Sequence, residues 1–299
     1  MKTNKLESWV EFIIDQQFHK QPVSAFLDFY HQSKKSKYTL FLDKHITLND
    51  KFITIDTLLT ISDSLKIKVS IEEERDFIDQ DLPLEVVYED DFILVVNKQC
   101  GMIVHPDTKE GLNTLANAVS HYYKSTNQNH TIRPIHRLDM DTTGLVMFSK
   151  CSFFQPYLDD ALNRKEIHRQ YYALVSGIFI KYEKLTISEP IGKDRHNNNK
   201  FRVSPSGKEA ITHVECVKCY QKQHYSLVRC TLETGRTHQI RVHLAYINHP
   251  ILSDSIYGRP SRWIQRCALH AYKLTFVHPL TQQNKTIEIE LPQDMIIKK

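Results

Sequence analysis

After residue 84 the sequence contains many segments with the apolar pattern of β-strands, and helical segments do not alternate regularly with them. Regular alternation of strands and helices would predict a parallel sheet, whereas strands that follow one another favour antiparallel pairing. The sequence therefore predicts the α+β class, with a central and mostly antiparallel sheet. The strand-like segments are 84–88, 92–96, 144–148, 171–175, 211–220, 225–232, 269–277 and 286–291, and the helical ones are 112–123 and 238–247.

The first part of the chain has a different pattern, which predicts a small separate domain. Segments 23–30 and 35–43 have helical spacing, and short strand-like runs follow them. Residues 72–83 carry six acidic side chains against one arginine, a composition typical of a solvated linker. We therefore expect a small α/β domain over residues 1–71, an acidic linker over 72–83 and a larger domain over 84–299.

Charge is unevenly distributed along the chain. The formal net charge is +4, and residues 85–299 carry 28 lysines and arginines against 21 acidic residues. A moderately basic larger domain is compatible with a polyanionic partner such as a nucleic acid. No apolar run approaches the ~18 residues that a membrane span needs, and segment 1–7 lacks the apolar core of a signal peptide. We therefore expect a cytoplasmic protein without a membrane partner.

The glycines and cysteines argue against several classes of site. None of the eight glycines has the spacing of a dinucleotide-binding or P-loop motif, which argues against a dehydrogenase or an NTPase. Cys216 and Cys219 have the spacing of a metal-binding pair, but no second pair or histidine motif accompanies them. Residues three apart on a strand point to opposite faces, so we expect two packing cysteines and no metal site.

The segment 136–144 places charged side chains directly before a predicted buried strand. It contains Arg137, Asp139 and Asp141. Ionised groups at the entry to a buried strand cost desolvation free energy unless they pair with one another or form a functional site. This segment is therefore the first candidate for a site.

The segment 234–243 is the second candidate. A predicted strand ends within it and a helix begins, with Arg236, His238 and Arg241 near the first turn. A helix N-terminus offers unpaired N–H groups and a favourable dipole to an anion. The pattern is compatible with an anchor for a phosphate or carboxylate, and equally with an internal ion pair between Arg241 and Asp139.

Both segments match motifs that occur together in one protein family. The segment 136–145, H-R-L-D-M-D-T-T-G-L, is similar to H-R-L-D-x-x-T-[ST]-G-L. Further matches in consistent order lie at 97–106, 171–175, 234–244, 249–258 and 269–271. With these motifs, residues 84–292 resemble the RluA family of pseudouridine synthases, although Gln99 stands where proline is usual. Residues 1–71 more loosely resemble the small S-four-like RNA-binding domain that many of these enzymes carry.

The resemblance implies an isomerase that converts uridine in RNA to pseudouridine by replacing the C1′–N1 bond with a C1′–C5 bond. Asp139 would be the carboxylate that acts on the sugar or the base. Arg241 would hold and orient that carboxylate, and Tyr171 would lie against the target ring.

The resemblance also implies contacts with RNA. The target nucleotide must leave the base stack, and Arg137 is expected to fill the vacated space, while Arg236 and His238 contact the RNA. Large-subunit ribosomal RNA is the commonest substrate in the family and transfer RNA the next. We expect a monomer that needs no metal or organic cofactor.

Two other interpretations of the same residues remain. An RNA-binding relative without activity would keep the motifs, and a glycosidase could use Asp139 and Asp141 as carboxylates ~5–10 Å apart. For the main interpretation, we expect the pair of Asp139 and Arg241 to face a solvent-accessible cleft, because a positive helix start suits an RNA-facing surface.

Overall fold

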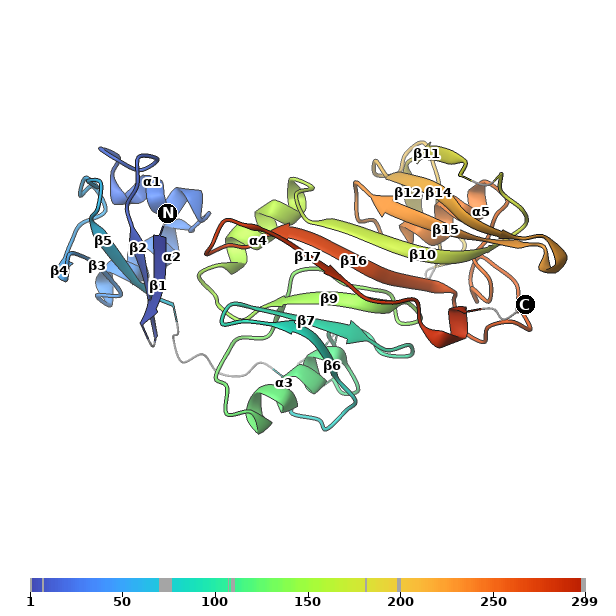
Figure 1. Cartoon of the computed structure of the whole chain (residues 1–299), viewed down its shortest axis with the longest axis horizontal. Helices are drawn as coiled ribbons and strands as arrows, with labels where there is room; N and C mark the ends of the chain where they lie inside the picture. The colour runs from blue at the N-terminus through green and yellow to red at the C-terminus, as the bar shows by residue number, and fades with distance from the viewer. Residues whose placement is uncertain are drawn as a thin grey trace.

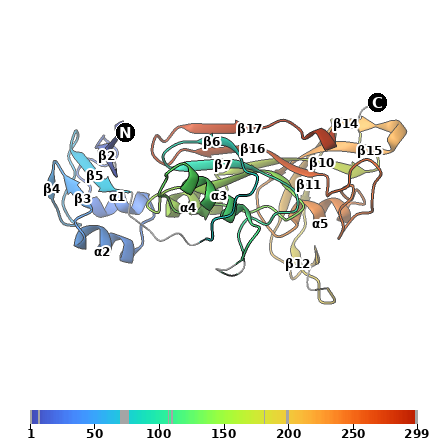
Figure 2. The same ribbon diagram turned by 90° about the horizontal axis from the view of Figure 1, so that it is seen from below.

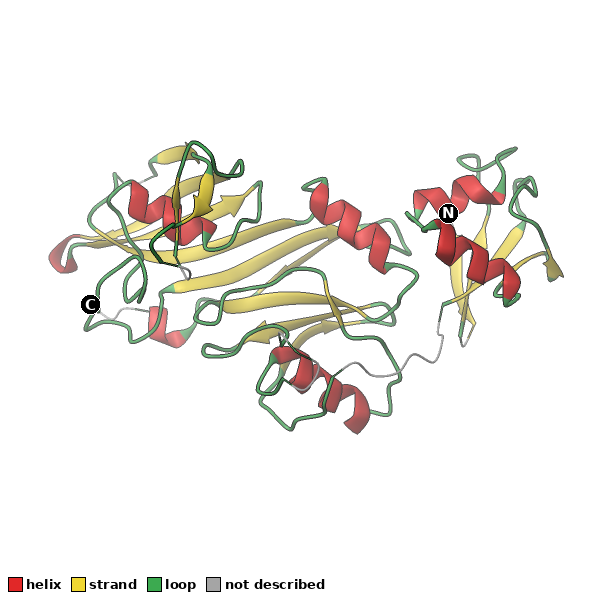
Figure 3. Ribbon diagram, turned by 180° about the vertical axis from the view of Figure 1, so that it is seen from behind, coloured by secondary structure: helices red, strands yellow, loops and turns green. Residues whose placement is uncertain are grey.

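The computed structural model describes residues 2–6, 8–69, 77–106, 108, 111–180, 182–197 and 200–296. In this part of the chain, a five-stranded sheet near the N-terminus precedes a ten-stranded sheet along the long axis of the molecule (Figure 1). The helices of the larger part lie on one face of its sheet (Figures 2 and 3). None of the described helices is long and apolar enough to cross a membrane.

The five-stranded sheet is antiparallel and has the strand order β1-β2-β5-β3-β4. Its strands and the helices that pack with them are β1 (Lys2–Leu6), β2 (Trp9–Ile13), α1 (Val23–Phe29), α2 (Lys34–Leu42), β3 (Ile46–Leu48), β4 (Lys51–Phe52) and β5 (Ser64–Lys68). Two strands precede the helices, so the expected order of helices followed by strands is wrong. The signal for β2 is present in the sequence, because Val10, Phe12 and Ile14 alternate and are all buried.

The ten-stranded sheet confirms the predicted α+β class. Its main path is β11-β14-β15-β10-β16-β9-β7-β6, with β17 beside β16 and β8 beside β9. The strands are β6 (Glu85–Glu89), β7 (Ile93–Lys98), β8 (Arg133–Pro134), β9 (Thr143–Ser149), β10 (His168–Ser176), β11 (Lys184–Ser188), β14 (Ile211–Tyr220), β15 (Tyr225–Leu232), β16 (Leu269–Val277) and β17 (Asn284–Glu288). Between the described strands of this sheet, every ladder except that of β9 with β16 is antiparallel.

The parallel contact between β9 and β16 depends on Gly144. Gly144 lies opposite Ala271 and has a φ of +114°, and a Cβ there would lie 2.2 Å from the carbonyl oxygen of Ala271. Only glycine combines this backbone conformation with so close an approach. The contact fixes the start of β9, and therefore the loop that precedes it, beside the centre of the sheet.

Helices and a hairpin complete the larger part: α3 (Leu115–Ser125), α4 (Gln155–Asn163), α5 (Gln239–Tyr246), and the hairpin of β12 (Ile191–Lys193) and β13 (Phe201–Val203), which projects from the body in Figure 2. The described end of the expected linker contacts α3, because Asn117 donates to the carbonyl of Ile78 and Ser120 donates to that of Phe77. The remainder of that linker, 72–76, lies outside the described residues.

An aromatic cluster joins the N-terminal sheet to the larger part. The ring of Tyr30, at the end of α1, lies 5.2 Å from that of Phe153, 5.5 Å from that of Phe154 and 5.7 Å from that of Tyr157. Tyr30 is fully buried, and the amide of Gln32 donates to the carbonyl of Phe153 at 2.8 Å. The apolar core is therefore continuous between the two parts.

Candidate active site

The six residues that the resemblance assigns to catalysis or RNA binding all line one cavity, between the loop before β9, strand β10 and the start of α5. They are Arg137, Asp139, Tyr171, Arg236, His238 and Arg241. Asp139 is the only carboxylate among the described lining residues, and its side chain is 23% exposed. Asp141 does not line the cavity, so the carboxylate pair that a glycosidase would need is missing there.

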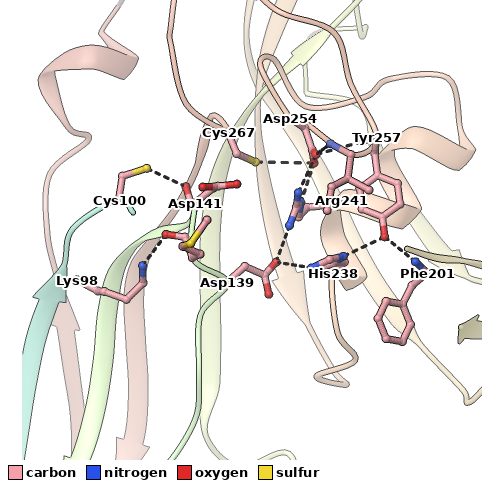
Figure 4. Close-up of polar contacts among 12 residues, drawn as sticks. Lys98, Cys100, Asp139, Asp141, Phe201, His238, Arg241, Asp254, Tyr257 and Cys267 are labelled. Carbon is pink, nitrogen blue, oxygen red and sulfur yellow. Dashed lines mark hydrogen bonds and ion pairs between the residues drawn. The ribbon is translucent and has the colours of Figure 1, made fainter. Parts of the chain in front are cut away.

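Lys98 holds the loop that carries Asp139. Its Nζ donates to the carbonyls of Gln99, Met102 and Met140 at 2.9, 2.7 and 3.1 Å, and Figure 4 shows it beside the Asp139 loop. The side chain is fully buried, and burial lowers its pKa to about 8. Because Met140 directly follows Asp139, the bond to its carbonyl ties the backbone from which the carboxylate projects to the segment after β7.

Arg241 is held mainly by Asp254 (Figure 4). Its Nε and Nη2 donate to the two carboxylate oxygens of Asp254 at 2.7 and 2.8 Å, and its Nη1 lies 3.2 Å from Oδ2 of Asp139. Burial opposes the charge of Arg241, but the hydrogen bonds and the negative charge of Asp254 outweigh it and raise the pKa of the guanidinium. Arg241 thus aims one N–H at Asp139 from a fixed position.

The sequence predicted that both Asp139 and Arg241 face a solvent-accessible cleft, but only Asp139 is substantially exposed to it. The side chain of Arg241 is 3% exposed, whereas that of Asp139 reaches the cavity. Asp254, which the sequence placed in a motif without a role, supplies the internal ion pair. Its fully buried carboxylate neutralises the guanidinium that Asp139 only partly contacts.

His238 lies inside the cavity next to Asp139. It starts α5 with a left-handed φ of 57°, and its Nε2 is 3.9 Å from Oδ2 of Asp139. Its Nδ1 lies 3.0 Å from the hydroxyl of Tyr257, which accepts from the backbone N–H of Phe201. When that hydroxyl donates to Nδ1, the ring proton is on Nε2, which faces Asp139. Burial lowers the pKa of His238, which favours the neutral ring.

Tyr171 and Arg169 form the wall of the cavity on β10. Tyr171 is buried, and burial raises the pKa of its hydroxyl. Arg169, which the sequence analysis missed, lies two positions earlier, and alternation along a strand places the two residues on one face. Within the part of the chain that the structure describes, its buried Nε has no hydrogen-bond partner, and a Cβ at Gly235 would lie 3.1 Å from Nη1 of Arg169. Gly235 therefore leaves room for this guanidinium.

The rim of the cavity is basic. Arg137 and Arg236 are both exposed, and Nε of Arg236 donates to the carbonyl of Glu209. Neither Arg137 nor Arg169 forms an ion pair with a carboxylate of the described chain. The cavity thus carries more positive than negative charge, and an anion such as a phosphate would compensate it. His136 faces away, buried, with Nε2 3.4 Å from the backbone N–H of Met147.

The expectation for Cys216 and Cys219 is wrong in its geometry. A β-bulge in the pairing of β14 with β15 brings both side chains to one side, and their sulfur atoms lie 3.4 Å apart. No group of three or more histidine, cysteine or acidic residues in the described ranges could hold a metal ion.

The cavity has the parts needed for one kind of chemistry. A partly exposed carboxylate, aimed by an arginine and flanked by a tyrosine ring, can act as a nucleophile or a base on a flat group bound against that ring. The positive rim would hold phosphates on either side of such a group.

Comparisons with known proteins agree with this interpretation of the cavity. Residues 92–246 match the family model of RNA pseudouridylate synthases. An uncharacterised RNA pseudouridine synthase of Bacillus subtilis is 37% identical over 84% of this chain and 83% of its own length. The ribosomal large subunit pseudouridine synthase D of Escherichia coli O157:H7 is 36% identical over 85% and 82%. The solved structure of human RNA pseudouridylate synthase domain containing 1 has the same fold, with a TM-score of 0.57, 24% identity and coverage of 70% and 83%.

Proposed function

Because the chain belongs to the RNA pseudouridine synthase family, we propose that Asp139, Tyr171 and Arg241 form the centre at which it isomerises uridine in RNA. The observation that carries this assignment is the position of Asp139, the only carboxylate on the described wall of the cavity, beside the fixed guanidinium of Arg241. The alternative of an RNA-binding relative without activity finds no support in this arrangement.

Asp139 performs the step that a carboxylate must perform. The reaction breaks the bond from C1′ to N1 and forms one from C1′ to C5. Addition of a carboxylate to C6 and removal of the C2′ proton both require an ionised group at this position, so Asp139 is needed by either route. Tyr171 lies against the flipped base, because its ring forms the cavity wall.

The arginines of the rim bind the RNA around the flipped nucleotide. Arg137 is exposed and next to the Asp139 loop, where it can fill the space that the target base leaves. Arg236 contacts the backbone of the RNA. His238 lies deeper, so its contact is with the target nucleotide rather than with the flanking strand.

The substrate we propose is large-subunit ribosomal RNA. Its support is the resemblance to the enzymes of this name in Escherichia coli and in Vibrio parahaemolyticus, which is 34% identical. Such a substrate places the protein in the cytoplasm. A single chain supplies every residue of the proposed centre, so a monomer suffices, which size-exclusion chromatography checks.

Mapping of pseudouridine across the RNA of cells with and without this gene tests the proposal. We expect one or a few uridines of large-subunit ribosomal RNA to lose the modification. The wild-type gene should restore it, whereas Asp139→Asn should not, although the variant protein folds and binds RNA. If only transfer RNA loses pseudouridine, the proposed substrate is wrong. If Asp139→Asn restores the modification, the assignment of Asp139 as the catalytic carboxylate is wrong.

A further inference from the structure

A second cleft lies at the other end of α5, outside the candidate active site. It has a volume of about 700 Å³, which is in the range of ligand sites. The loop 250–263 forms one wall, and the turn between β14 and β15 forms the other. We call it the α5 cleft and define it by Ser176, Tyr225, Tyr257, Arg259, Arg262 and Trp263.

The charge of the α5 cleft is positive. None of the described residues that line it is acidic. Arg259 and Arg262 are exposed, and neither guanidinium has an ion pair or hydrogen bond with a described residue. Two uncompensated arginines on the rim of one cleft favour a ligand with at least two negative charges.

The α5 cleft also offers a surface on which a flat ring can stack. The guanidinium of Arg262 lies over the ring of Trp263, 4.6 Å from its centroid. Bases of single-stranded RNA stack both on aromatic rings and on the planes of arginine side chains. A base placed on Arg262 would extend this stack while its phosphate met Arg259.

Tyr225 provides an independent sign of a ligand. The residue is 1% exposed, its ring is 6.2 Å from that of Trp263, and its buried hydroxyl has no hydrogen-bond partner among the described residues. A buried hydroxyl is normally paired. At the wall of the α5 cleft, this group can pair with a polar atom of a bound nucleotide.

The α5 cleft is rigidly connected to the active site. Oγ of Ser253 accepts from the backbone N–H of Ser261 and donates to the carbonyl of Ile264, which closes the loop that carries Arg259, Arg262 and Trp263. At the start of this loop, Asp254 binds Arg241 and the N–H of Tyr257. Tyr257 lines the α5 cleft and contacts His238 with its hydroxyl.

We propose that the α5 cleft binds a single-stranded segment of the RNA substrate that flanks the target uridine. Arg259 and Arg262 bind phosphates, and a base stacks on the pair of Arg262 and Trp263. The identity of the ligand rests on the proposed function, because RNA carries regular phosphates and flat rings together. An acidic peptide supplies the negative charges but not the regularly spaced flat rings.

The fluorescence of Trp263 reports this binding directly. The chain has two tryptophans, so Trp9→Phe leaves Trp263 as the only one. Titration with a ten-residue oligouridylate should quench its emission saturably. The double variant of Arg259→Gln and Arg262→Gln should weaken binding and reduce the slope of log affinity against log salt by about 1.4, or 0.7 for each phosphate. The matched control, Lys124→Gln with Arg164→Gln, removes the same charge from the C-terminal ends of α3 and α4 and should leave both the affinity and the salt slope unchanged.

Two further arms separate the possible outcomes. Trp263→Leu, followed by anisotropy of a labelled oligouridylate, should lower affinity roughly tenfold. Inorganic polyphosphate should compete with oligouridylate without quenching, and equal quenching by both would overturn stacking. If oligouridylate does not quench Trp263 while the protein forms pseudouridine normally, RNA binding at the α5 cleft is wrong and the proposed function stands. If oligouridylate quenches Trp263 but the protein forms no pseudouridine, RNA binding at the α5 cleft is supported and the proposed function is wrong.

Discussion

Arg241 and Asp254 form a bidentate ion pair in which both side chains are almost completely removed from solvent. Asp139 meets the same guanidinium through a single longer contact of 3.2 Å. The arrangement separates two tasks: Asp254 compensates the buried charge, and Asp139 remains available to the cavity. An arginine fixed in this way can orient a catalytic carboxylate without itself moving.

This division of tasks predicts the effect of Arg241→Met. The variant leaves Asp254 buried and unpaired, which should lower the free energy of unfolding by about 3–5 kcal/mol. Addition of Asp254→Asn should recover much of that loss, whereas addition of Asp139→Asn should recover little, because Asp139 is partly exposed. Denaturant unfolding of the single and double variants measures the difference. Equal recovery by both second substitutions would contradict the assignment of Asp254.

The sequence predicted the elements with strong local patterns. The segments 211–220, 225–232 and 269–277 coincide with β14, β15 and β16, because each combines strand-forming residues with clear boundaries. The two polar segments at 136–144 and 234–243 likewise predicted the residues that the structure brings into one cavity.

The sequence did not predict features that depend on contacts between distant parts of the chain. Helix α4 is short, so it depends on tertiary packing, and one of its buried side chains, Tyr157, packs against Tyr30 of the N-terminal part. Asp254 was not assigned to Arg241, because a pattern along the chain does not show which carboxylate lies behind a guanidinium. The bulge that joins Cys216 to Cys219 is set by pairing with β15, which the spacing of the cysteines does not reveal.

His136 should make the protein sensitive to acid. Burial lowers its pKa to about 3, from the ordinary value of 6.5. Between these two values the unfolded chain binds more protons than the folded one, so this contribution to stability is complete above about pH 6.5 and is lost as the pH falls toward 3. His136→Gln does not titrate, so its melting temperature should fall less between pH 7 and pH 4 than that of the wild type. An equal fall in the two proteins would contradict this role of His136.

Arg169 should contribute to RNA binding rather than to folding. It lines the cavity beside Tyr171, and no carboxylate among the described residues pairs with it. Arg169→Met should therefore keep the wild-type melting temperature, weaken binding of single-stranded RNA and reduce the salt slope by about 0.7. Arg169→Lys should restore the slope, because it restores the charge. A large drop in melting temperature with unchanged RNA affinity would make Arg169 a structural residue instead.

Tyr30 should couple the unfolding of the N-terminal sheet to that of the larger part. Its fully buried ring contacts Phe153, Phe154 and Tyr157, and its hydroxyl lies 3.3 Å from the carbonyl of Pro279. Tyr30→Ala removes these contacts and should cost about 3–5 kcal/mol, whereas Tyr30→Phe loses only the hydrogen bond and should cost about 1 kcal/mol.

The two tryptophans allow this coupling to be measured. Trp9 belongs to β2 and Trp263 to the larger part, so Trp263→Phe and Trp9→Phe each leave a single probe. In the wild-type background the two probes should report one common denaturant midpoint, because the core is continuous. With Tyr30→Ala, the Trp9 probe should unfold at lower denaturant than the Trp263 probe, because the N-terminal sheet then loses its docking surface. Coincident midpoints in the Tyr30→Ala protein would mean that the polar contacts, such as that of Gln32 with Phe153, suffice to couple the two parts.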